Sequence, residues 1–140
     1  MGCNPCSSSN KDLHDVEIPY DQSKLKMKLY WSIVSACNRS LKSIMIHGNV
    51  NYEDKYVDML KGEHKSEECL KYNPDGTIPF LVVNGKTLKE SASLLRFMAN
   101  AIPSLNYLYP KDFFVRHAID AALDFNGTQL RPQVERCHQI

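Results

Sequence analysis

Residues 73–91 read NPDGTIPFLVVNGKTLKES and contain the clearest structural signals in the chain. Phe80–Val83 is a short continuous apolar run, which is typical of a buried strand. Asn84-Gly85 follows at once, and this dipeptide is the strongest short signal for a β-hairpin turn. Residues 87–89 predict the returning strand. Two paired strands are therefore expected here, followed by a helix that Ser91 caps.

The sequence before this hairpin predicts alternating strands and helices. Residues 27–31 indicate a strand, and apolar residues between 41 and 46 form one face of a helix that ends near Gly48. Residues 52–57 indicate a second strand. Ser66 is expected to cap a short helix that breaks before Asn73-Pro74. After the hairpin, the helix from Ser91 is expected to end before Pro103. The order β-α-β-α-β-β-α predicts an α/β layered domain over residues 25–102.

Both flanks of this domain differ from it in composition. Residues 1–24 read as a polar tail. Residues 102–110 read as a linker, and one further helix is expected from Lys111 to Leu130. Its apolar residues at helical spacing are Phe114, Ala118, Ala121, Ala122 and Phe125. A lone helix with such a stripe has to bury it, so we expect a protein partner or a second copy of the chain to cover residues 111–130.

Composition excludes several classes of function. The 140 residues carry a formal net charge of +1 and contain no basic block, which argues against a nucleic-acid-binding protein. The longest apolar runs are far too short to span a membrane. Five cysteines are an odd number without a secretion signal, so we expect reduced thiols and a cytoplasmic location. Cys3 and Cys6 lack a second ligand pair at zinc spacing, and no metal site is expected.

Four separated segments resemble the theta class of glutathione transferases. They are residues 29–39 (LYWSIVSACNR), 57–66 (VDMLKGEHKS), 73–79 (NPDGTIP) and 88–91 (LKES). The resemblance runs from about residue 26 to 132 and implies a thioredoxin-like domain that binds glutathione. In that family a second, all-helical domain follows, so the resemblance implies that residues 111–132 are the first helix of a truncated C-terminal domain.

Ser35 lies where the first strand gives way to the first helix. By resemblance, its hydroxyl donates a hydrogen bond to the glutathione sulfur, which lowers the thiol pKa and favours the nucleophilic thiolate. From the residues alone, Ser35 is an ordinary N-cap or turn residue. The sequence departs from the family immediately after it, because Ala36-Cys37 stands where a polar residue and a proline are usual.

The resemblance also implies a set of glutathione-binding residues. Thr77, Ile78 and Pro79 would place a cis-proline next to the ligand's cysteinyl backbone. Glu90 would face the ligand's amine, and Ser91 would hold the γ-glutamyl carboxylate at a helix N-terminus. His64 and Lys65 would approach the glycine carboxylate. Taken without the family, Pro79 is an ordinary trans proline, Ser91 a simple cap, and His64-Lys65 a solvated pair.

The first seven residues, MGCNPCS, suggest lipidation. They resemble the start of some Src-family kinases, which implies myristate on Gly2 and palmitate on Cys3 and Cys6, and hence a cytoplasmic membrane face as a partner. The alternative is an unmodified tail.

Two functions remain open. The first is a glutathione-binding subunit that is docked in an assembly or anchored and has little transferase activity alone. The second is an active glutathione transferase whose second pocket a partner completes.

Overall fold

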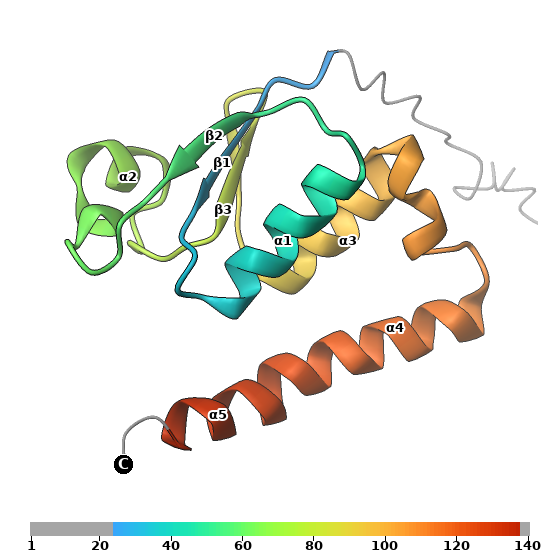
Figure 1. Cartoon of the computed structure of the whole chain (residues 1–140). Helices are drawn as coiled ribbons and strands as arrows, with labels where there is room; N and C mark the ends of the chain where they lie inside the picture. The colour runs from blue at the N-terminus through green and yellow to red at the C-terminus, as the bar shows by residue number, and fades with distance from the viewer. Residues whose placement is uncertain (1–23, 138–140) are drawn as a thin grey trace, which may run out of the picture.

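A computed structural model describes residues 24–137 of the chain (Figure 1). The proposed lipidation residues Gly2, Cys3 and Cys6 lie outside these described residues. The elements, in chain order, are β1 (Met27–Trp31), α1 (Ala36–His47), β2 (Glu53–Tyr56), η3 (Glu63–Lys65), α2 (Glu67–Tyr72), β3 (Phe80–Val83), β4 (Lys86–Leu88), α3 (Ser91–Ala101), η4 (Pro103–Leu108), α4 (Phe113–Phe125), η5 (Asn126–Leu130) and α5 (Arg131–Cys137).

The four strands form one mixed sheet in the order β2-β1-β3-β4. β1 and β2 are parallel, whereas β3 pairs antiparallel with both β1 and β4. Asn84 and Gly85 both have positive φ at the turn between β3 and β4, as a tight hairpin requires. The predicted thioredoxin-like α/β fold is confirmed.

Helices cover both faces of this sheet: α1 and α3 lie on one face and α2 on the other (Figure 1). Alternate strand residues supply the two cores. Leu29 and Leu81 are fully buried with α1 and α3. Tyr30 and Phe80 point to the opposite face, where their rings stack with centroids 4.4 Å apart. Both faces of β3 are therefore buried, as its continuous apolar sequence predicts.

Two helix starts differ from the sequence-based expectation. α1 begins at Ala36, directly after Ser35, and so starts well ahead of the apolar residues 41–46 that indicate this helix in the sequence. α3 has Glu90 as its N-cap, and Ser91 is its first helical residue. The prediction that Ser91 caps α3 is wrong by one position. The cause is the backbone of Glu90, which has a φ of 68° and turns the chain into the helix there.

The C-terminal helix is longer than predicted. Its N-cap is Asp112, whose side chain accepts a hydrogen bond from the backbone N–H of Val115 at 2.9 Å. It then runs through α4, the π-helical turn η5 and α5, past Pro132. This proline follows closely after the π-helical turn η5, where the regular α-helical hydrogen-bonding pattern is already interrupted. The expected linker is also partly ordered, because residues 103–108 form η4.

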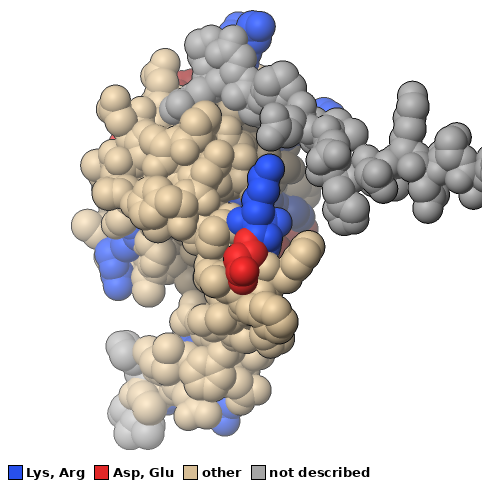
Figure 2. Space-filling view, turned by 90° about the vertical axis from the view of Figure 1, so that its right-hand side faces the viewer, with Lys and Arg blue, Asp and Glu red and all other residues tan. Residues whose placement is uncertain are grey.

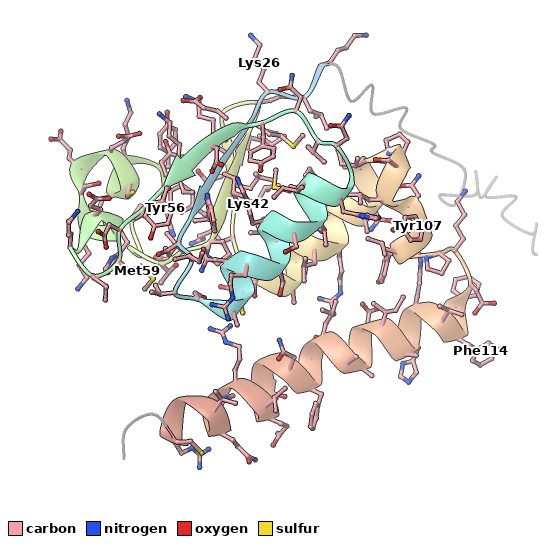
Figure 3. The ribbon with its side chains drawn as sticks, in the orientation of Figure 1. Lys26, Lys42, Tyr56, Met59, Tyr107 and Phe114 are labelled. Atoms are coloured by element: carbon pink, nitrogen blue, oxygen red, sulfur yellow. The ribbon has the colours of Figure 1, made fainter. Side chains whose placement is uncertain are left out.

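The face of α4 that meets the domain is not its predicted apolar stripe. The stripe residues are all exposed, with 86% exposure at Phe114 and 58% at Phe125. Phe114 points away from the rest of the molecule in Figure 3. The half-buried positions lie on another face and include Ile119, Asp120 and Leu123. The stripe therefore remains uncovered in this chain. Across residues 24–137, no helix has the length and apolarity needed to cross a bilayer.

Candidate functional site

The predicted site segments meet at one edge of the sheet. β1 and the parallel β2 both end at this edge, where Trp31 is paired with Tyr56. β3 runs the opposite way and begins there, with Phe80 paired to Tyr30. β4 ends there at Leu88. The segments that carry Ser35, His64, Ile78 and Ser91 leave or enter these strand ends, so the topology brings them together.

Ser35 occupies the N-cap position of α1 and is half-buried. Its side chain makes no capping hydrogen bond to the helix. Its backbone carbonyl accepts a hydrogen bond from the N–H of Arg39 at 3.2 Å. The hydroxyl is therefore not consumed by its own helix, and it lies where the dipole of α1 favours negative charge.

The loop before β3 is held by its own side chains. The buried Asn73 donates through Nδ2 to the carbonyl oxygen of Thr77 at 2.7 Å and to its hydroxyl at 3.1 Å. The Ile78–Pro79 peptide bond is cis, as the family resemblance implied. The loop also touches η3, because a Cβ built on Gly76 would lie 3.6 Å from Cγ of Lys65. The structure thus brings Lys65 and Thr77 to neighbouring loops.

The segment between β4 and α3 joins the same edge. Lys89 forms an ion pair with Asp75 of the preceding loop, which ties the two segments together. The positive φ of Glu90 is uncommon for a residue with a side chain and marks a constrained position. Glu90 itself is exposed, and Ser91 follows in the first turn of an eleven-residue helix. This geometry suits a carboxylate ligand at the start of α3.

His64 lies half-buried in η3 at the same edge. Its ring atom Nδ1 is buried and has no hydrogen-bond partner among the described residues. A buried polar nitrogen without a partner is uncommon, and a bound ligand is one way to satisfy it. Lys65 is exposed beside it.

A small cavity of about 50 Å³ lies where α1, α3 and the C-terminal helix meet. Its lining residues are Cys37, Ser40, Ser91, Ala92, Leu95, Leu123, Asn126, Gly127 and Arg131. Ser91 is the one predicted site residue in this list. The sequence did not predict that Asn126 and Arg131 line a cavity with Ser91, because no local sequence pattern connects positions so far apart in the chain.

A polar cluster holds the C-terminal helix against the domain. Arg96 of α3 contacts Asp120 at 2.6 Å and Asp124 at 3.1 Å. The hydroxyl of Tyr109 donates to both carboxylate oxygens of Asp120. Arg96, aided by Tyr109, lowers the pKa of the Asp120 carboxyl, and burial together with the bond to Asp120 raises the pKa of Tyr109. The guanidinium of Arg116 lies 4.6 Å from the centre of the Tyr109 ring.

A larger hollow, of about 380 Å³, lies on the side of the sheet that α2 covers. Several of its polar side chains already have partners within the protein. Tyr30 donates to Glu68 at 3.2 Å, and Glu63 accepts from the backbone N–H of Asp58 at 2.8 Å. Burial is the main cause that raises the pKa of Tyr30. We therefore place the candidate site at the strand edge, where His64 and Ser35 keep free polar atoms.

The distribution of charged and metal-ligating side chains over the described residues bears on other classes of ligand. In Figure 2 the charged side chains of the described residues are scattered, and they form no continuous basic surface on that face. Between residues 24 and 137, no group of three or more histidine, cysteine or acidic side chains could hold a metal ion.

Comparisons with known proteins agree with this geometry. Residues 34–101 match the family described as "Glutathione S-transferase, N-terminal domain". Mouse glutathione S-transferase theta-1 is 29% identical over 105 residues, which are 75% of this chain and 44% of the mouse protein. The apo structure of human glutathione S-transferase T1-1 superposes with a TM-score of 0.69 at 29% identity, over 75% of this chain and 44% of the human one.

A glutathione transferase homologue from Drosophila mojavensis, solved with bound glutathione, superposes with a TM-score of 0.68 at 28% identity. The match covers 74% of this chain and 48% of that one. The chain thus spans about half the length of the relatives that it matches. The sheet order, the strand-edge site and these similarities lead to one conclusion: the chain carries a theta-like glutathione S-transferase N-terminal domain with a thioredoxin-like fold.

Proposed function

We propose that this chain binds glutathione along the edge of its sheet. The observation that supports this most strongly is the convergence of all four predicted segments at that edge, from residues that are up to 56 positions apart between Ser35 and Ser91. A relative with the same fold was solved with glutathione bound. Glutathione has a carboxylate at each end, an amine and a thiol, so it needs several distinct contacts.

Each end of the ligand has a suitable group. The hydroxyl of Ser91 and the first N–H groups of α3 would hold the γ-glutamyl carboxylate, and Glu90 would pair with the amine. His64, through its unpartnered ring nitrogen, and Lys65 would meet the glycine carboxylate at the other end. Between them, the backbone of Ile78 would pair with the cysteinyl residue as an added strand does, next to Thr77.

Ser35 would meet the thiol. A hydrogen bond from its hydroxyl to the sulfur favours the thiolate, and the N-terminus of α1 adds positive potential at the same point. This arrangement would raise the fraction of nucleophilic thiolate at neutral pH.

Calorimetry on the full chain tests this function. Wild-type protein should bind reduced glutathione, and Ser91→Ala should weaken binding by about tenfold, because a charge-assisted hydrogen bond is lost. Ser93→Ala is the matched control, since Ser93 is exposed on the same helix. The proposal fails if the wild-type protein binds no glutathione, or if Ser91→Ala and Ser93→Ala bind equally well.

We further propose that the chain works as a docked subunit, with a protein partner or a second copy covering the outer face of α4. The exposure of Phe114 and Phe125 supports this, because large apolar side chains grouped on one helix face are typical of interaction sites. Phe125→Ser should shift the protein to smaller species in size-exclusion chromatography with light scattering. A wild-type monomer that recovers no partner would contradict docking.

The alternative is an active transferase. The thiolate arrangement at Ser35 favours it, and a partner would complete the second pocket. Conjugation of glutathione to an aryl halide by the isolated chain, lost in Ser35→Ala, would favour this alternative over a docked subunit with little activity. Glutathione binding without conjugation would favour the docked subunit.

A further inference from the structure

The turn between β1 and α1, residues 32–35, determines where the Ser35 hydroxyl lies. This hydroxyl makes no capping bond to α1, so its own hydrogen bonding does not fix its position. Cys37 stands two residues after Ser35, so no proline ring restricts φ at the start of the helix. The restraint on the turn must come from other contacts.

Two side chains from the first turn of α1 reach back to this turn. Asn38 accepts through Oδ1 a hydrogen bond from the backbone N–H of Ser32 at 3.2 Å. Arg39 donates from Nη1 to the carbonyl oxygen of Ile33 at 2.7 Å. Asn38 and Ser32 are both fully buried, whereas Arg39 is exposed. Together the two contacts hold the N–H of Ser32 and the carbonyl group of Ile33, which lie in the first half of the turn.

The buried contact is the stronger restraint. If Asn38 were truncated, the N–H of Ser32 would stay buried without its acceptor, and a buried donor left without a partner is costly. The turn would then move to find another partner. A hydrogen bond to a thiolate weakens steeply as its distance and angle change, so a small shift of the turn would weaken the contact from Ser35.

We propose that Asn38 is a positioning residue for Ser35, with Arg39 as a second, weaker brace. The inference rests on the proposed function, because it assigns Asn38 a part in setting the ionisation of bound glutathione. Asn38 would not touch the ligand. It would act only through the position of the turn that presents the Ser35 hydroxyl to the sulfur.

The test follows the ultraviolet absorbance of the thiolate of bound glutathione against pH in four proteins: wild type, Asn38→Ala, Ser35→Ala and the double variant. Asn38→Ala should lower the fraction of thiolate at pH 7 by about threefold or more, in the same direction as Ser35→Ala. The double variant should match Ser35→Ala alone, because Asn38 acts through Ser35. Ser43→Ala, at an exposed position farther along the same helix, should leave the thiolate fraction unchanged.

Four outcomes overturn the proposal. An unchanged thiolate fraction in Asn38→Ala, with glutathione still bound, refutes the positioning role and leaves the proposed function standing. If Asn38→Ala lowers the thiolate fraction equally in the wild-type protein and in Ser35→Ala, Asn38 does not act through Ser35. A wild-type protein that binds no glutathione refutes both claims. If Asn38→Ala fails to fold, Arg39→Ala removes the exposed brace, and a smaller loss of thiolate is expected; no loss there also refutes the proposal.

Discussion

Replacing Gly48 with alanine should destabilise the domain by overpacking. Gly48 ends α1 with a φ of −76°, so alanine can adopt its backbone conformation. The obstacle is space, because an added Cβ would lie 2.7 Å from Cγ of Leu105 and 2.9 Å from each of its Cδ atoms. Carbon atoms in ordinary contact lie about 3.5–4.0 Å apart, so a shift of roughly 1 Å is needed.

Leu105 is fully buried in the main core and cannot move away freely. Overpacking of this kind costs about 1–3 kcal/mol, and the gain from replacing glycine at a compatible φ offsets about 0.4–1 kcal/mol of it. We therefore expect a net loss of about 1–2 kcal/mol. For a domain of this size, the midpoint of thermal unfolding should fall by roughly 5–10 °C.

Circular dichroism during thermal and urea unfolding measures this loss. Gly127→Ala is the matched control, since an added Cβ there meets nothing within 4 Å and stability should not fall. Leu105→Ala is destabilising alone, but it should remove most of the cost of Gly48→Ala in the double variant. A Gly48→Ala protein as stable as the wild type would refute the packing argument and the close contact between Gly48 and Leu105 of η4.

Three other perturbations probe the C-terminal helix. Arg96→Ala should speed amide hydrogen exchange in α4 at low salt but much less in 1 M salt, whereas Lys89→Ala, which breaks an ion pair away from α4, should not. Because the pKa of Asp120 is lowered in the folded protein, its stabilising contribution is complete above the ordinary aspartate pKa of about 3.9 and is lost as pH falls through the lower folded value. Opening of α4, measured by amide exchange corrected for its intrinsic pH dependence, should therefore increase below about pH 4 in the wild-type protein. Asp120→Asn should lose this pH dependence. Asp112→Ala should fray the first turn of α4, seen as faster exchange there, without changing global unfolding, because no residue of α4 is buried.

Local sequence signals predicted the strands well and the helix ends less well. The apolar run Phe80–Val83 and the Asn84-Gly85 turn are determined by neighbouring residues, and the structure agrees with both. Helix starts depend on single backbone angles. The positive φ of Glu90 makes this residue the N-cap of α3 in place of Ser91, and no sequence pattern predicts that angle. α1 ends near Gly48, as the sequence predicts, but the positive φ belongs to Asn49, and a glycine at position 48 allows the close approach of Leu105.

The orientation of α4 shows why periodicity alone was insufficient. The helix has two faces with apolar residues, and Phe114 and Phe125 made one of them the more hydrophobic. The structure turns the other face to the domain because Arg96, half-exposed on α3, pairs with Asp120 and Asp124. That pairing joins residues 24 and 28 positions apart and is invisible to a local window. The site residues were likewise brought together by strand order, and only the family resemblance linked them beforehand.

The two parts of the proposed site should respond to different perturbations. The contacts for the carboxylates, at His64, Lys65 and Ser91, come from the sheet domain, whose cores fix them. One wall of the cavity beside Ser91 comes from residues 123–131. No residue of α4 is buried, so the ion pairs of Arg96 with Asp120 and Asp124 are the main contacts that hold this wall near the domain. Conditions that weaken this cluster should therefore disturb the surroundings of Ser91, which lines the same cavity, whereas His64 and Lys65 do not line it. In the proposed binding mode, loosening the C-terminal helix should affect the γ-glutamyl end of glutathione before it affects the glycine end.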